Sequence, residues 1–456
     1  MPLIRSLTAG TSSLKAHQQR FDVIANNIAN VNTIGYKASR ANFIEQFNQT
    51  FRLGSAPNII TAGGIGGIDP LQIGLGVRLG SVKVDFSQGS IKVTNRPTDL
   101  ALQGPGFFVV ERNGKQLFTR AGAFSFDRDG FLVDSSTGAY VQGYNLKKDS
   151  NGLVVKDSNG VNVLDRTLTN IKVPPTFKSA PRQTQEIKLA GNLNASLAAG
   201  DTVNPTVTIY DNQGAEHVLR LQFTKSATIN QFTLEVFIDG DTANPIPITV
   251  GGASATTQTI TFNGDGTLSS PLNFTLTAAD LNATLSAING VPVTAFDDTT
   301  PKDITVILAE PTDLLGGITQ FAAQSTVSVT SQDGYSSGEL EKITIDQTGK
   351  IIGAFSNGQS ELLGQIVIAQ FNNPEGLLKE GNNFYSVTPN SGLAKIGTAV
   401  EIFPGTAIAS GALEESNVDL TEEFTDMIAT QRAFQAAARV VTVSDQFLTE
   451  ITALRR

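Results

Sequence analysis

The stretch LIRSLTAGTSSLKAHQQRFDVIANNIANV (residues 3–31) determines one end of the fold, because its apolar side chains recur at steps of three and four residues. Such steps place them along one side of an α-helix with the 3.5-residue repeat of a coiled coil. At 1.5 Å per residue this helix would be about 43 Å long, and Gly35 favours a left-handed stop after it. The seam positions are Ile4, Leu7, Thr11, Leu14, Gln18, Phe21, Ala25 and Ile28.

The other end of the chain, FTDMIATQRAFQAAARVVTVSDQFLTEITALRR (424–456), shows the same spacing. Ser416 or Asp419 is expected to cap this helix, and Asp419-x-x-Glu422 has capping-box spacing. A helix with two apolar faces can contact two partners at once, which favours a polymer. One stripe comprises Phe424, Met427, Gln431, Phe434, Ala438, Val441 and Leu448, interrupted by Asp445, and the second comprises Val440, Val443, Phe447, Ile451 and Leu454.

Charge is distributed unevenly along the 456 residues, whose formal net charge is −9. Residues 1–52 carry +4, residues 413–456 carry −4 and residues 180–309 carry −7. The two ends are therefore complementary in charge, and the acidic middle segment is expected to be a solvated outer domain. The acidic balance argues against a general nucleic-acid binder. No run of 18 apolar residues and no secretory signal pattern occurs in the chain.

Between the ends the pattern is mostly that of β-strands. Asn113-Gly114 is a strong hairpin signal, a second turn spans 127–130, and residues 278–289 favour a short helix. Phe43, Phe47 and Phe51 fit a second short helix within 36–53. The fold class predicted is mainly β with α-helical termini: a coiled-coil-like inner domain, a discontinuous β-rich middle domain and an inserted, β-barrel-like outer domain.

The composition shifts and Gly- and Pro-rich breaks suggest four parts. Residues 1–53 and 411–456 would form a helical polymerisation domain, with Gly-rich connectors at 54–76 and 400–410. Residues 77–178 and 310–399 would form a discontinuous β core, and residues 179–309 an inserted acidic outer β domain.

The sequence offers little for catalysis. It has no cysteine and two isolated histidines, His17 and His217, so a transition-metal site has few ligands. Asp297 and Asp298 are the best candidates for paired carboxylates of a secreted enzyme or carbohydrate-binding protein, but a turn before Thr299 explains them better. We expect no enzymatic activity, no catalytic residues, no cofactor and no metal.

Four asparagines, at 26, 27, 30 and 32, cluster near the end of the first helix, where asparagine competes for backbone groups. They are either caps of a fraying helix end or amides that bond across a subunit contact. The predicted subunit contacts on the inner helices are Ile4, Leu7, Leu14, Phe21, Ile28, Asn26, Asn27, Asn30, Phe424, Met427, Phe434, Val441, Leu448 and Ile451.

Two long motifs, LKAHQQRFDVIANNIANVNTIGYK (14–37) and GALEESNVDLTEEFTDMIATQRAFQAAARVVTVSDQFLTEI (411–451), resemble the terminal signatures of the axial proteins of the bacterial flagellum, the family of rod and hook subunits. Residues 86–110 and 118–144 are similar to that family's core β domain. The insert and the segment 313–377 favour the hook branch, with a distal rod-type protein as the alternative, because rod subunits of this kind lack a large insert.

The resemblance implies a structural subunit that polymerises into a curved helical tube. This tube would act as a universal joint that transmits torque from rod to filament, and it would enclose the export channel. The implied partners are copies of the same chain, the rod, hook cap and hook–filament junction proteins and the flagellar type III export machinery, with no nucleic acid and no membrane span. The implied location is the flagellar basal body and hook, outside the cell after export without a cleaved signal peptide. The lysinoalanine cross-link of some relatives needs a cysteine and is excluded.

Overall fold

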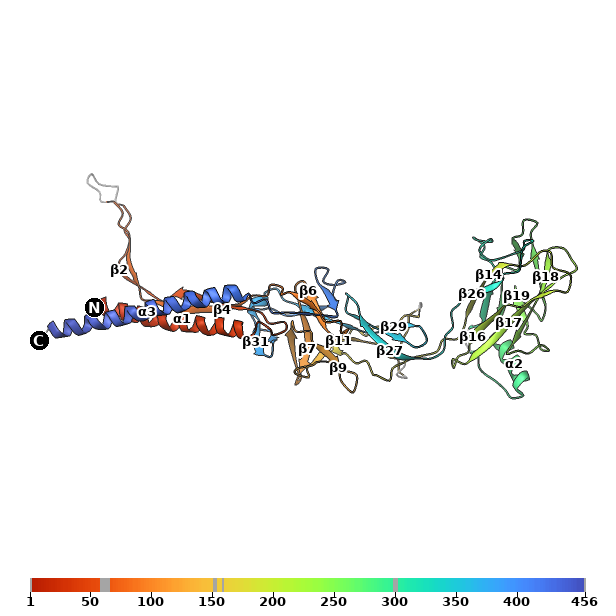
Figure 1. Ribbon diagram of the computed structural model, residues 1–456, viewed down its shortest axis with the longest axis horizontal. Helices are drawn as coiled ribbons and strands as arrows, with labels where there is room; N and C mark the ends of the chain where they lie inside the picture. The colour runs from red at the N-terminus through yellow and green to blue at the C-terminus, as the bar shows by residue number, and fades with distance from the viewer. Residues whose placement is uncertain (1, 58–65, 151–153, 158–159, 298–301, 455–456) are drawn as a thin grey trace. The chain divides into compact units, whose positions relative to one another are not determined.

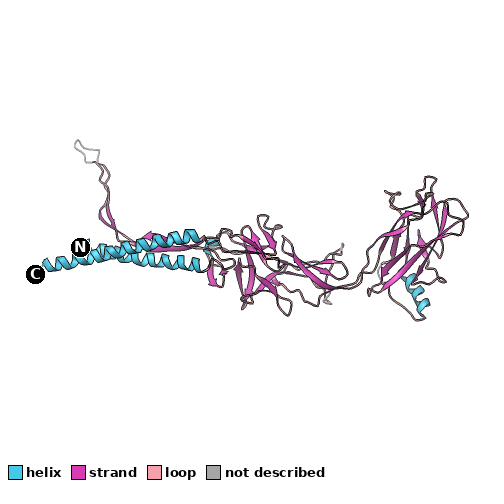
Figure 2. Ribbon diagram, viewed as in Figure 1, coloured by secondary structure: helices cyan, strands magenta, loops and turns pink. Residues whose placement is uncertain are grey.

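The computed structural model describes residues 2–57, 66–150, 154–157, 160–297 and 302–454. The protein is mainly β, with one long helix at each end of the chain (Figure 2). The chain divides into two compact units. Unit 1 comprises residues 1–175, 343–353 and 362–456, and unit 2 comprises residues 176–342 and 354–361.

The terminal helices are α1, Pro2–Ala29, and α3, Leu420–Leu454. After α1 the chain turns, and Gly35 has a φ of 66°, the left-handed conformation expected for a stop. Asp419 caps α3, because its Oδ1 accepts the N–H of Thr421 at 2.8 Å. Both helices predicted from the apolar spacing are confirmed.

The helix predicted within residues 36–53 is wrong. This segment forms strands β1, Ser39–Glu45, and β2, Asn48–Arg52. A spacing of four residues is also a multiple of two, so Phe43, Phe47 and Phe51 fit one face of an extended chain as well as one face of a helix. Tertiary contacts decide in favour of the strand. β1 pairs with β4, Val77–Val84, and the ring centroids of Phe43 and of His17 in α1 are 5.4 Å apart in an edge-on arrangement.

The segments expected to be Gly-rich connectors contain strands. Within 54–76, β3, Leu71–Gly74, pairs with β2 and forms a hairpin, while residues 58–65 lie outside the described part. Within 400–410, β34, Ala407–Ser410, pairs with β6, Leu100–Gln103. In both places a partner strand satisfies the backbone, so the glycine content nearby does not prevent pairing.

The β core of unit 1 joins segments that are far apart in the sequence. β7, Phe107–Arg112, and β8, Lys115–Thr119, form the predicted hairpin, with positive φ at Asn113 and Gly114. β7 also pairs with β11 and β30, and β8 with β32. Phe107, Phe118 and Tyr385 fill the core between them. Further strands of unit 1 are β5 Ile91–Val93, β9 Phe124–Phe126, β10 Leu132–Asp134, β11 Tyr140–Asn145, β12 Thr169–Asn170, β30 Ile368–Gln370, β31 Leu378–Gly381, β32 Phe384–Ser386, β33 Lys395–Gly397 and β35 Ala412–Glu414. β28 Lys350–Phe355 and β29 Ser360–Ile366 belong to it in part, since residues 354–361 are assigned to unit 2.

Unit 2 contains two sheets around one apolar core, to which Leu221, Phe232 and Phe274 contribute. The predicted short helix is present as α2, Ala278–Asn289, between a Thr277 cap and left-handed Gly290. One sheet contains β14 Glu186–Asn192, β19 Ile248–Val250, β20 Ala253–Ala255, β23 Asn273–Leu276, β24 Ile304–Ile307, β25 Ile318–Thr319 and β26 Ser328–Gln332. The other contains β15 Thr202–Val203, β16 Thr206–Tyr210, β17 Glu216–Lys225, β18 Gln231–Ile238, β21 Gln258–Phe262 and β22 Leu268–Ser270.

Two features of unit 2 bear on the sequence-based expectation of an inserted, barrel-like outer domain. The described strands form two separate ladders, and no pairing among them closes a barrel. The unit also continues past residue 309, the expected end of the insert, to Lys342. The reason is that β25 and β26 pair with β14, so the chain after residue 309 completes a sheet whose first strand lies near the start of the acidic segment. β13, Lys178–Ser179, pairs with β27, Gly338–Ile345.

Candidate functional site

The two terminal helices lie side by side and run antiparallel (Figure 1). Residues near the start of α1 contact residues near the end of α3, and the reverse holds at the other end of the pair. The hydroxyls of Ser6 and Ser444 are 3.1 Å apart, and the Asn27 amide donates to Glu423 Oε1 at 2.9 Å. Ion pairs of Arg20 with Asp426 and of Arg40 with Glu422, each 2.8 Å long, join the basic and acidic ends. The complementary charge read from the sequence therefore acts within one chain.

Small side chains form the buried line between the helices. On α3, Thr430, Ala437 and Ser444 are buried at intervals of seven residues. Ala437 faces α1 at Gly10, where an added Cβ would lie only 2.9 Å from Val441 Cγ2 and 3.6 Å from the carbonyl oxygen of Ala437. The backbones therefore approach closely at Gly10. This seven-residue spacing of small residues was the sequence signal for the line of contact, and the large apolar residues did not mark it.

The predicted contact residues lie beside this line or away from it. Asn27 is buried, while Asn26 is exposed. The exposed fractions of Phe424, Phe434 and Ile451 are 50%, 42% and 49%. The half-buried group comprises Leu7, Leu14, Phe21, Ile28, Asn30, Met427, Val441 and Leu448. Ile4 belongs to α1, but its side chain lies outside the described part.

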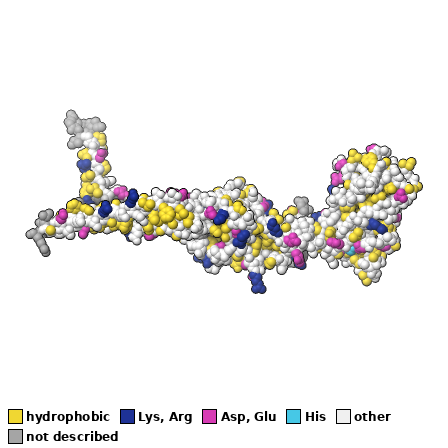
Figure 3. Space-filling model, viewed as in Figure 1, with side chains coloured by type: hydrophobic (Ala, Val, Ile, Leu, Met, Phe, Trp, Pro, Cys, Tyr) yellow, Lys and Arg dark blue, Asp and Glu magenta, His cyan; other side chains and the backbone are white. Residues whose placement is uncertain are grey.

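The helical pair leaves apolar side chains uncovered. Figure 3 shows hydrophobic side chains gathered over its visible face. Four of the exposed residues, Val440, Val443, Phe447 and Ile451, are the described members of the second stripe predicted for α3, while the side chain of Leu454 lies outside the described part. Contiguous exposed apolar surface of this kind marks sites of protein association.

The asparagines near the end of α1 bond within the chain. The Asn27 amide donates to the Ser39 carbonyl oxygen at 2.8 Å, and its Oδ1 accepts from the Ser39 N–H at 3.0 Å and from the Tyr36 hydroxyl at 3.1 Å. The Asn30 amide donates to the backbone oxygen of Asn26 at 2.8 Å. The Asn30 bond satisfies a backbone oxygen at the helix end, whereas the Asn27 bonds join α1 to the segment that follows it. Together they fix the chain as it leaves α1.

Glu423 is the acidic partner of Asn27. Burial raises the pKa of its carboxyl, with Asp426 and Glu422 adding to the rise and the Asn27 hydrogen bond and Arg40 opposing it. A carboxyl whose pKa is higher in the folded state makes folding more favourable as pH falls through that pKa.

Glu423→Gln keeps the oxygen that accepts from Asn27 and removes the partly buried charge. We expect the free energy of unfolding at pH 7 to change by less than about 1 kcal/mol, in the stabilising direction. The gain of the variant over the wild type should shrink as pH falls towards 4.5, the ordinary pKa of the carboxyl. Urea unfolding at several pH values measures both, and a gain that grows on acidification would contradict the prediction.

A buried ion cluster (Lys37, Arg120 and Glu414) ties both ends of the chain to the β core of unit 1. The side chains of Lys37 and Glu414 are fully buried, and Arg120 is 3% exposed. Lys37 Nζ lies 2.7 Å and Arg120 Nη1 3.4 Å from the Glu414 carboxylate, which also accepts the N–H of Gly89 at 3.0 Å. Burial lowers the pKa of Lys37, and Glu414 opposes that shift.

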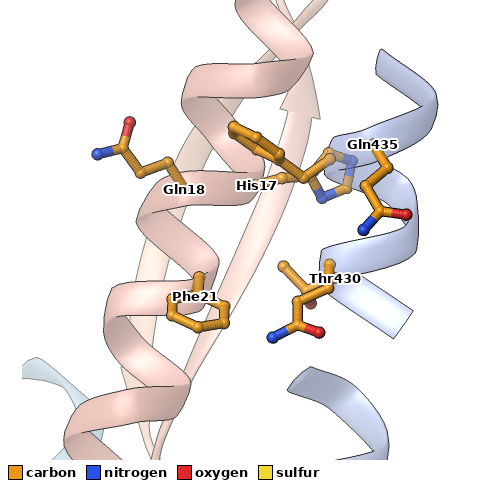
Figure 4. A pocket seen from close by; sticks show the side chains of 7 residues that line it. His17, Gln18, Phe21, Thr430 and Gln435 are labelled. Carbon is orange, nitrogen blue, oxygen red and sulfur yellow. The ribbon is translucent and has the colours of Figure 1, made fainter. Parts of the chain in front are cut away.

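A groove of about 440 Å³ opens between the terminal helices. Its walls come from His17, Gln18 and Phe21 of α1 and from Thr430, Gln431, Phe434 and Gln435 of α3, with His17 facing the α3 side (Figure 4). Among the described residues no partner reaches His17 Nδ1 or the hydroxyl of Thr430, and Thr430 is only 2% exposed. Burial, with the charge of Arg20 adding to it, lowers the pKa of His17 and so favours the neutral ring.

Two other residues considered as catalytic or metal-binding candidates, His217 and Asp297, contact oppositely charged or hydrogen-bonding side chains of the same chain. His217, on strand β17, places Nδ1 2.7 Å from Asp239. Asp297 pairs with Lys302 at 3.0 Å, and Asp298 lies outside the described part. Within the described ranges no group of three or more His, Cys, Asp and Glu side chains is placed to hold a metal ion. None of the described helices has the length and apolar character needed to cross a membrane.

Three family models match the chain. The model described as "Flagella basal body rod protein" matches residues 7–37, and "Flagellar basal body rod FlgEFG protein C-terminal" matches residues 409–454. "Flagellar basal body protein FlaE D2 domain" matches residues 192–335. The first two matches cover most of α1 and α3, and the third covers most of unit 2.

Curated relatives align along the whole chain. A protein of Treponema pallidum named flagellar hook protein FlgE is 37% identical, with all of both chains covered. Proteins of the same name from Borreliella burgdorferi and Escherichia coli are 34% and 32% identical, each covering 99% of this chain and all of the relative.

Proposed function

We propose that the paired terminal helices of this chain, which belongs to the flagellar hook protein family, form the contact surface through which copies assemble into a tube. The chain is a structural subunit of the bacterial flagellar hook. The observation that carries the proposal is the apolar face that pairing leaves exposed: α1 and α3 cover each other along a line of small residues, while Phe424, Phe434 and Ile451 stay uncovered. The family is structural and is not an enzyme family.

The proposed polymer is a curved helical tube that works as a universal joint between rod and filament and encloses an export channel. Exposed stripes on α3 beside the intramolecular contact support it, because one helix can then contact its own α1 and a neighbouring copy. We propose the predicted contact residues of both helices as parts of these contacts. For Asn27 and Asn30 the proposed role is indirect, since their amides bond within the chain and orient α1.

In the proposed tube, three parts of the chain occupy three radial positions. The terminal segments line the inner tube, the β core surrounds them, and the acidic insert beginning near residue 179 forms the outer domain. The finer shape of that outer domain, predicted to be barrel-like, is supported only as two sheets around a shared core. We further propose rod, hook cap and junction proteins as neighbours in the flagellum and the flagellar type III machinery as the route of export.

Purified full-length protein should form tubes that negative-stain electron microscopy resolves. Deleting residues 1–30 and 424–456 should abolish the tubes, because it removes both helices. Tubes formed by the truncated protein would contradict the proposal. Labelling of isolated hook–basal bodies tests the hook assignment in situ, and label confined to the rod would favour the rod-type alternative.

A further inference from the structure

The β2–β3 hairpin presents an apolar face that the described residues leave largely exposed. Register places Gln49 opposite Ile73, so Phe47, Gln49, Leu71 and Ile73 share one face, to which Phe51 at a bulge contributes. The exposed fractions of Phe47 and Leu71 are 71% and 51%. A two-stranded hairpin alone is marginally stable in water, so this face gains most from a surface on which to pack.

The groove between α1 and α3, here called the helix groove, has open space and polar atoms without a hydrogen-bond partner among the described residues. Its aromatic walls, Phe21 and Phe434, enclose space, and two polar atoms, His17 Nδ1 and Thr430 Oγ1, have no partner within the described residues. A buried polar group without a hydrogen bond costs roughly 1–3 kcal/mol. A suitable occupant therefore brings apolar side chains together with hydrogen-bonding groups, and it brings no charge to the unpaired atoms.

We propose that the helix groove of one subunit receives the apolar face of the β2–β3 hairpin of a second copy of the same chain. The residues from 47 to 51, Phe-Asn-Gln-Thr-Phe, are uncharged and carry amides beside the two phenyl rings. The neutral state favoured at His17 suits that occupant. The inference rests on the proposed polymer and names one of its contacts.

The hairpin of the same subunit lies at the wrong place to fill the groove. Its Phe51 ring contacts the Arg5 guanidinium at 4.9 Å, while the groove residue of α1 nearest to Arg5 in the sequence is His17. The twelve steps from Arg5 to His17 span about 18 Å at 1.5 Å per residue. The exposed stripe of α3 is the competing occupant, but at 3.6 residues per turn Arg439 and Glu450 lie along its edge. It would therefore bring charge towards an uncharged groove.

The absence of cysteine allows a direct test in the full-length chain. Gln435→Cys at the groove is activated as a thiopyridyl disulfide and copolymerised with Gln49→Cys protein. Attack of the free thiolate on the activated sulfur releases thiopyridone and leaves a disulfide between two copies. Thr50→Cys, on the opposite face of the hairpin, is the matched control, and Val443→Cys on α3 reports the competing occupant.

We expect covalent dimers from the Gln49→Cys mixture in tubes, and loss of those dimers in unassembled protein and in the Thr50→Cys mixture. Tubes in which Val443→Cys cross-links instead, or in which none of the variants cross-links, overturn the inference and leave the proposed polymer intact. If the cysteine-free parent forms no tubes, the proposed function fails and the inference fails with it.

Discussion

Glu414→Gln is expected to lower the free energy of unfolding of unit 1 by about 3–5 kcal/mol, the usual cost of removing one partner of a buried ion pair. The substitution keeps the shape of the side chain but leaves Lys37 and Arg120 as two buried cations without their anion. Urea unfolding followed by circular dichroism measures the change. Because the N-terminal and C-terminal segments meet the β core at this cluster, loss of structure should extend to both helices.

The neighbouring residue supplies the control. Glu415 is 46% exposed as a side chain and lies 3.7 Å from Lys92. Exposed pairs contribute little, so Glu415→Gln should change the free energy of unfolding by less than about 1 kcal/mol. Equal losses in the two variants would show that burial of the cluster is not what stabilises this junction.

The two cations are expected to be coupled through Glu414. Lys37→Met combined with Glu414→Gln should cost less than the sum of the single changes, because the double variant buries one cation fewer. In Glu414→Gln alone, the pKa of Lys37 should fall further below its ordinary value of 10.5. The unfolded state then binds more protons than the folded state, so the stability of this variant should rise with pH.

Gly10→Leu is expected to abolish tube formation while leaving both β units folded. Even a Cβ at this position would lie 2.9 Å from Val441 Cγ2, and a leucine would force the helices apart. Overpacking of this kind costs about 1–3 kcal/mol, although leucine is a better helix former than glycine by roughly 0.8 kcal/mol. The terminal segments should therefore keep their preference for the helical state, but α1 and α3 should no longer pair. Without pairing, the exposed apolar stripes lose their arrangement.

Sedimentation and negative-stain electron microscopy measure the effect of Gly10→Leu. Thr11→Leu is the matched control, since Thr11 is exposed and adjacent in the same helix. Val441→Ala removes the atom nearest to the added side chain and should partly restore tubes in the double variant. Normal tubes from Gly10→Leu alone would show that close approach of α1 and α3 is not needed for assembly.

The elements that the sequence predicts correctly are those whose signals lie within one short segment. The apolar steps predict α1 and α3, Asn113-Gly114 predicts the β7–β8 hairpin, and residues 278–289 predict α2, because each depends on periodicity or turn chemistry within one segment. The helix predicted for the segment 36–53 is wrong because a four-residue spacing suits both a helix and a strand. Its strand form depends on β4 and α1, which local spacing does not reveal.

The family assignment and the presence of a helix at each end were properties of the sequence alone. Tertiary structure decided which sides of those helices face each other. Gly10 and Ala437 lie on the inner line because small side chains allow the backbones to approach there. Thr430 and Ser444 are buried seven residues to either side of Ala437, which leaves larger apolar residues beside the contact or exposed. The ion cluster was also a tertiary result: Lys37, Arg120 and Glu414 are far apart in the chain, and only the folded β core removes all three from water.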